Sequence, residues 1–371
     1  MIHQRNNNYI ALVIHAIFCL LTAHCRNGDS LHSSMSKASI PFADTTTFVF
    51  IMPDSLGNFQ MEHGLLNESP MPIQGLLKIP RLAVNPEKQQ QLSLQMQHDG
   101  KIALACAVVF AATGDERFRH KACDYLAAWS HIEEFADGGS FFWDFFIGRL
   151  AGDTPIVTFC QFSKFIVAAE LCRYFADDFQ AQVARAYRYA LKYRPAQNNN
   201  HQSWKNLFLL LSSLYLRDGN YRHFLDELAT CITTQIDYQG RMPLELRRGR
   251  KALTYTLMNL EALVYAAYLG RVLGYPLPEE KLKSAVDFFM LHFVNETAWR
   301  RQAGVRGDVN APDSPDVWAW ITVLPSRWWK TADWPGGQQW FNIEARRAYL
   351  LFYPQLFLCQ TNRKAEMTCT L

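Results

Sequence analysis

The sequence predicts an all-α protein built as a train of antiparallel helix pairs. Apolar residues recur at three- and four-residue spacing, which is the period of an amphipathic helix. The stretches with this spacing are joined by short connections with helix-stop signals, such as Thr113-Gly114-Asp115 and Asp218-Gly219-Asn220. Strand-like alternation is scarce along the chain. The predicted helices span residues 90–113, 115–135, 157–175, 179–193, 201–217, 221–236, 249–273 and 279–294.

Trains of helix pairs close into solenoids or toroids. No fixed sequence period indicates a tetratricopeptide-type array, so we expect one large helical domain over residues 90–371. A last helix is expected near residues 344–358.

The segment before this domain has a different character. Residues 1–25 combine a basic start with a short apolar run that ends near small residues, which is typical of an export signal peptide. A buried first helix is the alternative. Residues 26–89 are polar and rich in proline, and we expect them to form an irregular N-terminal wrap. The protein is therefore expected to be secreted or periplasmic, and not membrane-bound once the signal is removed.

Composition excludes several classes of protein. Hydrophobic residues make up 49% of the chain, which excludes disorder, and a net charge of +3 is too small to indicate nucleic-acid binding. The cysteines do not form close CxxC pairs, which argues against a zinc site. We expect a monomer without metal or cofactor.

Aromatic residues gather in two places. Six of the ten tryptophans lie in a loop-rich stretch, and they fit stacking on sugar rings and filling a core equally well. The run Phe141-Phe142-Trp143-Asp144-Phe145-Phe146 is better suited to a core, because contiguous aromatic residues cannot all face one groove. The six tryptophans are Trp318, Trp320, Trp328, Trp329, Trp334 and Trp340.

The common catalytic motifs are missing from the sequence. It contains no P-loop, no GxGxxG after a strand, no GxSxG and no HExxH, which argues against nucleotide chemistry, serine hydrolysis and zinc proteolysis. Carboxylates that could serve a glycosidase lie near the aromatic run, but ordinary solvated charges explain them better. These are Glu133, Glu134, Asp137 and Asp144.

The first cluster with chemical potential is Asn198-Asn199-Asn200-His201-Gln202-Ser203-Trp204, which opens an apolar helix. Helix capping alone explains one asparagine. Three asparagines and a histidine exceed that need. The free N–H groups and the positive end of the helix dipole favour an anion here and bias His201 towards its neutral form, so the cluster could hold a carboxylate.

The second cluster runs from Pro243 to Tyr255. Arg248 and Tyr255 are seven residues apart, which predicts one helix face with a separation of about 10 Å along the axis, within side-chain reach. Taken alone, this cluster is better explained as a basic solvated helix end with a core tyrosine.

Together the clusters resemble the alginate lyase superfamily, and specifically the mannuronate-cleaving alginate lyases of polysaccharide lyase family five. The resemblance is carried by Asn199-Asn200-His201 with Trp204, and by the pattern Pro-Leu-Glu-Leu-x-Arg-Gly-x-x-Ala-Leu-x-Tyr from Pro243 to Tyr255. It implies an incomplete (α/α) toroid of antiparallel helix pairs that acts as a polysaccharide lyase on an anionic polysaccharide. Gln202-Ser203 and Thr256 depart from the family pattern, which bears on the substrate more than on the reaction.

The resemblance also implies roles for individual residues. Asn200, His201 and Arg248 would neutralise the uronate carboxylate, and Tyr255 would be the base and then the acid of a β-elimination. In an alternative assignment His201 is the base and Tyr255 only the acid. Asn199, Trp204 and Arg250 would bind substrate. The alternative functions are a polyglucuronate lyase, an (α/α)-toroid glycoside hydrolase and a non-catalytic glycan-binding scaffold.

Overall fold

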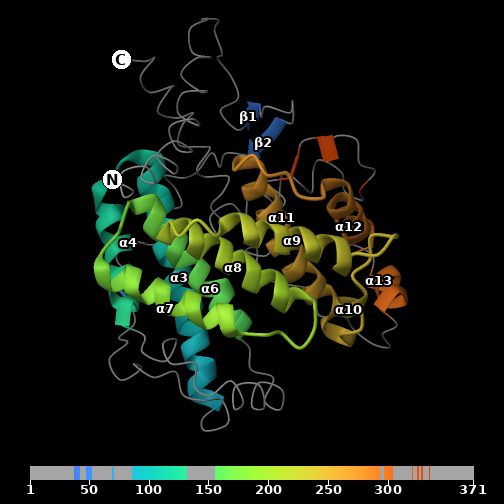
Figure 1. Cartoon of the computed structure of the whole chain (residues 1–371), viewed down its shortest axis with the longest axis horizontal. Coiled ribbons are helices and arrows are strands. Elements are labelled where there is room, and N and C mark those ends of the chain that lie inside the picture. The colour runs from blue at the N-terminus through green and yellow to red at the C-terminus, as the bar shows by residue number, and fades with distance from the viewer. Residues whose placement is uncertain are drawn as a thin grey trace, which may run out of the picture. The chain divides into compact units, whose positions relative to one another are not determined.

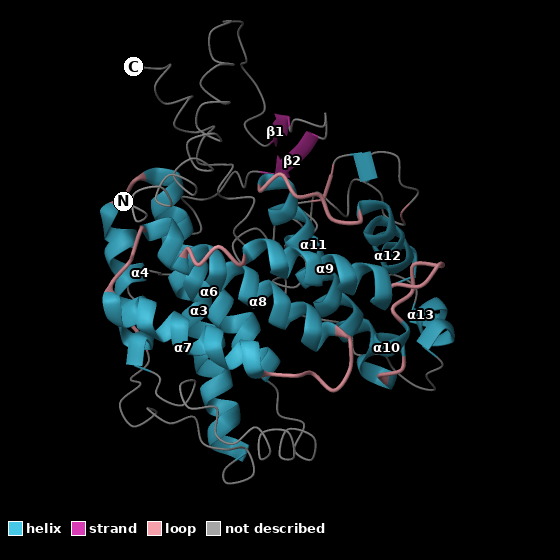
Figure 2. Cartoon of the chain, viewed as in Figure 1, coloured by secondary structure: helices cyan, strands magenta, loops and turns pink. Residues whose placement is uncertain are grey.

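A computed structural model describes residues 37–41, 47–51, 69–70, 86–131, 155–292 and 296–303, with residues 320, 324, 325, 327, 328 and 334. Helices dominate these residues (Figure 2), as the sequence predicts. The helices are α3 (Pro86–Thr113), α4 (Glu116–Ala128), η1 (Trp129–His131), α6 (Pro155–Cys172), α7 (Asp177–Lys192), α8 (Asn200–Leu216), α9 (Tyr221–Gln235), α10 (Pro243–Leu246), η2 (Gly249–Lys251), α11 (Ala252–Val272), α12 (Glu279–His292) and α13 (Glu296–Ala303), most of which are labelled in Figure 1.

The eight predicted helices are all present, and their ends differ from the prediction for local reasons. Helix α6 ends at Cys172 because Arg173 adopts a left-handed backbone with φ of 52°. Helix α11 starts at Ala252 because a single 3₁₀ turn occupies residues 249–251. The short helices α10 and α13 were not predicted, because four and eight residues carry too little periodicity to detect.

Two short strands lie within the segment that was predicted to be irregular. Strands β1 (Lys37–Pro41) and β2 (Thr47–Ile51) pair antiparallel, with Lys37 opposite Ile51. The predicted last helix near residues 344–358, the aromatic run at 141–146 and the signal peptide lie outside the described residues.

The chain divides into two compact units. The first comprises Met1–Ser55, Asn198–Ser203 and Leu225–Leu371, and the second comprises Leu56–Gln197 and Trp204–Phe224. Helix α8 therefore starts in the first unit and continues in the second. Both predicted site clusters belong to the first unit, apart from Trp204.

The second unit packs helices α3, α4, α6 and α7 around an aromatic core. Phe159 of α6 stacks on Phe208 of α8 with ring centroids 5.2 Å apart, and both rings are fully buried. The indole nitrogen of Trp129 donates to the buried carboxylate of Asp99 at 2.9 Å, which satisfies a polar pair inside this core. Helix α7 shows how the amphipathic pattern is used: its buried side includes Phe179, Val183, Ala186 and Ala190.

The first unit is built on α11, which is apolar on all sides and buried along most of its length. Helix α12 packs against it (Figure 1). The turn between α9 and α10 reaches α12 through Gly240, which has φ of 78° and lies so close to Ser284 that a β-carbon would overlap the Ser284 carbonyl. This close approach sets the path of the chain into α10 and the second cluster.

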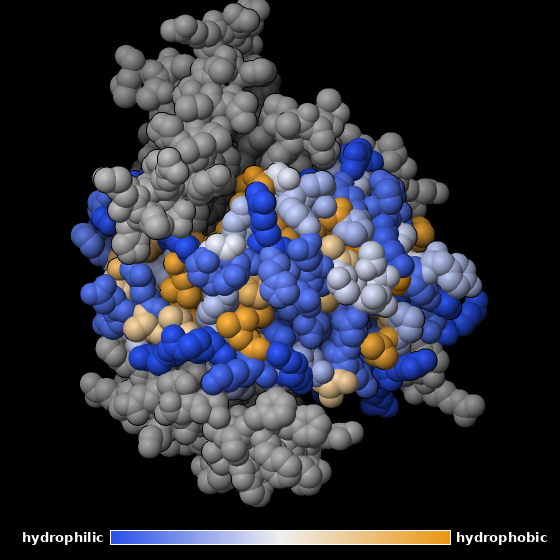
Figure 3. Space-filling model, viewed as in Figure 1, coloured by the Kyte–Doolittle hydropathy of each residue, from blue (hydrophilic) through white to orange (hydrophobic). Residues whose placement is uncertain are grey.

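Hydrophilic residues predominate on the described part of the face in Figure 3, as expected for helices that bury their apolar sides. Within the described residues, no helix has both the length and the apolar character needed to cross a membrane.

Candidate active site

The first turn of α8 is held by Asn199. The side-chain oxygen of Asn199 accepts a hydrogen bond from the backbone N–H of His201 at 3.1 Å, and its carbonyl accepts from Gln202 at 2.8 Å. Capping therefore accounts for Asn199, as the simpler explanation of the asparagine run proposes. It leaves the side chains of Asn200 and His201 free for another task.

Asn200 is fully buried, yet its side-chain nitrogen and oxygen have no hydrogen-bond partner among the described residues. An amide that is buried without partners costs about 1–3 kcal/mol, so native proteins rarely keep one without a reason. A ligand carboxylate would provide the missing partner for the amide N–H. This is the feature expected of a residue that receives a substrate group.

The backbone of Asn200 is tied to the second cluster by a carboxylate. The N–H of Asn200 donates to Oε1 of Glu245 at 2.6 Å, and Nδ2 of Asn259 donates to the same oxygen at 3.1 Å. Nδ2 of Asn259 also lies 2.8 Å from Oε1 of Gln235, at the end of α9. One carboxylate oxygen thereby joins the start of α8 to α10 and α11.

Asn198 completes this polar network. Its Nδ2 donates to Thr234 at 2.7 Å, and its Oδ1 accepts from Nε2 of Gln235 at 2.7 Å. Ser203 donates to Oε1 of Gln235 at 3.1 Å. The asparagine run is therefore anchored on the last turn of α9 on one side and on Glu245 on the other.

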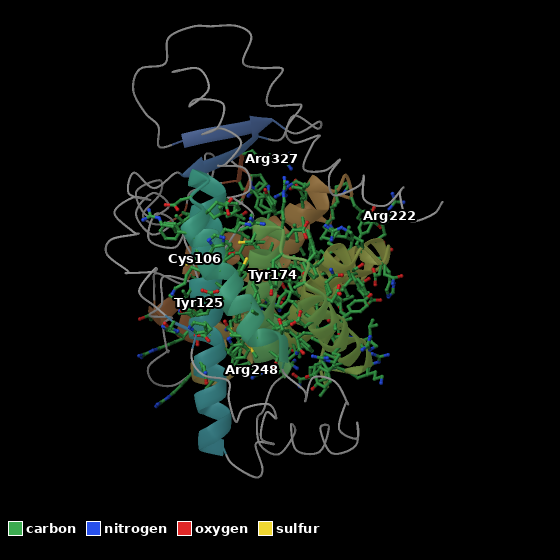
Figure 4. The ribbon with its side chains drawn as sticks, turned by 90° about the vertical axis from the view of Figure 1, so that its left-hand side faces the viewer. Cys106, Tyr125, Tyr174, Arg222, Arg248 and Arg327 are labelled. Atoms are coloured by element: carbon green, nitrogen blue, oxygen red, sulfur yellow. The ribbon has the colours of Figure 1, made fainter. Side chains whose placement is uncertain are left out.

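Arg248, labelled in Figure 4, lies in the turn between α10 and α11. Its guanidinium carbon is 4.1 Å from the centroid of the Tyr255 ring. The prediction that these residues share a helix face is wrong in detail, because Arg248 precedes the helix that carries Tyr255. Gly249, with φ of 61°, turns the chain so that Arg248 folds back over the first turn of α11.

The electrostatics of the site follow from burial and from Arg248. Burial first, and the positive charge of Arg248 second, lower the pKa of His201 to about 4, so its ring is neutral at neutral pH. This agrees with the neutral form predicted from the helix start. Burial raises the pKa of Glu245 to about 7, and the hydrogen bond from Asn200, the charge of Arg248 and the hydrogen bond from Asn259 oppose that rise.

The four residues predicted to be catalytic are therefore linked. Asn200 contacts Glu245, and Arg248 acts electrostatically on both Glu245 and His201 while it stacks on Tyr255. Glu245 and Asn259 were not predicted from the sequence to belong to the site. Glu245 lies between two leucines in Pro243-Leu244-Glu245-Leu246, and this apolar setting was a usable signal that its charge is buried and not solvated.

The three residues predicted to bind substrate have different environments. Asn199 is used as a helix cap, Trp204 is 3% exposed, and Arg250 is exposed in the 3₁₀ turn before α11. Their roles in binding stay predictions.

Of the six clustered tryptophans, Trp320, Trp328 and Trp334 lie within the described residues, and all three are buried. This favours a core role for them. Trp318, Trp329 and Trp340, and the carboxylates Glu133, Glu134, Asp137 and Asp144, lie outside the described residues. Within the described part of the chain, histidine, cysteine and carboxylate side chains form no group of three that could hold a metal ion.

Comparison with known proteins supports this reading. Residues 173–299, which include both clusters, match the family model described as alginate lyase. A search of curated proteins finds no match. A complex of alginate lyase A1-III, a tyrosine-to-phenylalanine variant with a tetrasaccharide, aligns at a TM-score of 0.53 with 15% identity, covering 83% of this chain and 84% of that one.

Two further solved structures are histidine-to-alanine variants of alginate lyase A1-III. The tetrasaccharide complex aligns at a TM-score of 0.52 with 13% identity, over 83% of this chain and 84% of that one. The apo form aligns at 0.50 with 15% identity, over 63% and 67%. At this level of identity the likeness concerns the fold, which is the predicted (α/α) toroid.

The helical toroid and the family match define the class: this chain is a polysaccharide lyase. More narrowly, residues 173–299 match the alginate lyase family model, and this match contains both clusters from which the resemblance to that superfamily was predicted.

Proposed function

We propose that this chain cleaves alginate at mannuronate residues by β-elimination, leaving unsaturated uronate ends. The observation that carries the proposal is the arrangement of Arg248, which stacks on Tyr255 and lies within electrostatic reach of neutral His201. The match of residues 173–299 to the alginate lyase family supports the polysaccharide class.

The reaction needs a neutralised carboxylate. The C6 carboxylate of a uronate makes the C5 proton acidic only if the negative charge that builds there during proton removal is stabilised. The Asn200 amide, the neutral His201 ring and the Arg248 guanidinium offer hydrogen bonds and positive charge for this purpose. This chemistry requires no metal.

Tyr255 suits the proton transfers. The Arg248 guanidinium carbon lies 4.1 Å from the centroid of its ring, so a positive charge is held beside the proposed base. The regenerated phenol can then protonate O4 of the leaving sugar. A histidine whose pKa is about 4 is a weak base and a better hydrogen-bond donor to the carboxylate, which favours this assignment over the one with His201 as base.

The preference for mannuronate rests on stereochemistry. In mannuronate and glucuronate the C5 proton and the C4 oxygen lie on the same side of the ring, so one tyrosine can serve both. In guluronate they lie on opposite sides. Polyglucuronate is the main competitor, because Gln202 and Thr256 depart from the family pattern, although Thr256 is buried and does not face solvent.

The proposal is tested by incubating the purified protein with a panel of polyuronates and following ultraviolet absorbance. A conjugated C4–C5 double bond should form without consumption of water, and a chelator should not slow its formation. Shortened chains without unsaturated ends would point to a hydrolase. Binding without shortening would point to a glycan-binding scaffold.

We also propose export through a signal peptide over residues 1–25, which would give a secreted or periplasmic protein acting as a monomer. The apolar run near the start of the sequence supports this. N-terminal sequencing of the exported protein tests it, and a mature chain that keeps residues 1–25 contradicts it.

A further inference from the structure

Glu245 is a buried carboxylate to which the proposed mechanism gives no role. Glu245 is 0% exposed, and its Oε2 atom has no hydrogen-bond partner among the described residues. Removing a carboxylate from water costs several kcal/mol, and a hydrophobic residue of similar volume usually stabilises such a position as well or better. A carboxylate kept at this cost is therefore expected to serve the site.

We propose that Glu245 is a positioning residue of the lyase site, which holds Asn200 and His201 in place by fixing the first turn of α8. This inference rests on the proposed function. Glu245 is not itself placed against the substrate.

The contacts at Oε1 show how the carboxylate does this. The first N–H groups of an α-helix have no partner within the helix, and here two side chains serve two of them. Asn199 accepts from the N–H of His201 at 3.1 Å, and Glu245 accepts from the N–H of Asn200 at 2.6 Å. The second bond is shorter than an ordinary N–H···O bond, as expected when the acceptor carries a charge.

The Glu245 carboxylate is itself held in place by a hydrogen bond from α11. Nδ2 of Asn259 on α11 donates to Oε1 of Glu245 at 3.1 Å and to Oε1 of Gln235 at 2.8 Å. The start of α8 is therefore fixed to the helix that carries Tyr255. This matters because the Asn200 amide is free for a ligand, and a displacement of about 1 Å in such a group can cost roughly 10²-fold in rate.

The charge state of Glu245 adds a measurable signature. The titratable or charged groups near Glu245 are His201, on α8, and Arg248, in the turn before α11. Helix α11 contributes the uncharged Asn259. His201, with a pKa of about 4, does not titrate near neutrality. Because the pKa of Glu245 is raised to about 7, the carboxylate loses its charge as pH falls through that value, and its bond to Asn200 weakens.

The test compares Glu245→Gln, which keeps an acceptor oxygen, with Glu245→Leu, which removes it. A matched control is Glu170→Leu, which removes a partly buried carboxylate paired with Arg217 in the other unit. Amide hydrogen exchange at Asn200 is measured by NMR without substrate. We expect protection in the unaltered protein, in Glu245→Gln and in Glu170→Leu, and exchange roughly ten- to a hundredfold faster in Glu245→Leu.

Turnover on polymannuronate should then fall roughly 10²-fold in Glu245→Leu through kcat rather than KM. Glu245→Gln should restore it in part, to the level that the unaltered protein keeps once Glu245 is protonated, because in both cases an uncharged oxygen accepts from the Asn200 N–H. The unaltered protein should lose turnover as pH falls through about 7, and Glu245→Gln should lack that step. The inference is overturned if a folded Glu245→Leu protein shows unchanged amide exchange at Asn200 or an unchanged kcat. It is also overturned if turnover of Glu245→Gln falls with pH in the same way as that of the unaltered protein. The exchange measurement needs no substrate, so a failure of the lyase proposal is recognised separately.

Discussion

The guanidinium carbon of Arg248 lies 4.1 Å from the centroid of the Tyr255 ring, although Arg248 is not on the helix that carries Tyr255. The turn at Gly249 brings the two side chains together. The positive charge is therefore held over the Tyr255 ring by the backbone path of the turn.

Replacing Tyr255 with phenylalanine should nearly abolish turnover. The change removes one hydroxyl and keeps the ring under Arg248, so folding and substrate affinity should change little. The expected loss in kcat is ~10²–10⁴-fold, the usual contribution of a positioned acid–base group. Steady-state kinetics on polymannuronate, with thermal unfolding as a control, measure it. A Tyr255→Phe protein with most of its activity would falsify the proton-transfer role.

Replacing Arg248 with alanine should raise KM and lower kcat together, because the guanidinium is proposed to meet the carboxylate both in the bound substrate and as charge builds during proton removal. Arg222→Ala is the control: Arg222 is exposed on α9 and stacks on its neighbour Tyr221. Both variants lose one positive charge. If Arg222→Ala were equally damaging, the effect of Arg248 would be a general attraction for the polyanion and not a contact in the site.

His201 should titrate far below the ordinary range of histidine. NMR titration should give a pKa of about 4 where the unfolded chain has about 6.5. Between these values the unfolded state binds a proton that the folded state does not, so the folded state loses stability as pH falls from 6.5 towards 4. Glu245, whose pKa is raised to about 7, gains a proton in the folded state over the same range and opposes this loss in any variant that keeps it. Denaturant unfolding should therefore show the His201 effect as a difference: the stability of the unaltered protein falls relative to that of His201→Gln as pH falls from 6.5 towards 4. A pKa near 6.5 in the folded protein contradicts the buried, neutral ring.

Gly240→Ala should destabilise the first unit by about 1–3 kcal/mol, because it forces a side chain into left-handed backbone and against the Ser284 carbonyl. Gly219→Ala is the matched control. Gly219 has φ of 82°, but a β-carbon added there would meet no atom within 4 Å, so only the backbone strain remains. Thermal or denaturant unfolding compares them, and equal losses would mean that the approach to α12 does not matter.

Initial rates on size-matched homopolymers should rank polymannuronate first, polyglucuronate second and polyguluronate last. The gap to polyguluronate should be large, because a misplaced acid–base group forfeits ~10²–10⁴ in rate. The three polymers are compared in one buffer by the absorbance of the new double bond. Equal or faster elimination on polyguluronate would contradict the single-tyrosine mechanism and indicate that His201 acts as an independent base.

Local sequence signals were sufficient for the helices. The 3.6-residue period of apolar side chains predicted eight of them, and α7 illustrates the reason: one face of Phe179, Val183, Ala186 and Ala190 must be buried whatever its neighbours are. Short elements such as α10 carry too few residues for a period, so they could be found only in the folded chain.

The sequence by itself determined which residue types form the candidate site, because both clusters can be recognised as linear patterns. One is an asparagine run with a histidine at a helix start, and the other is an arginine shortly before a tyrosine. Only the tertiary structure decided how they meet. Glu245 lies 45 residues from Asn200, and their 2.6 Å hydrogen bond depends on the packing of α8, α10 and α11. In sequence the only sign of burial at Glu245 is its place between two leucines. Its contacts with distant helices, which no local pattern encodes, are what make its carboxylate an anchor for Asn200.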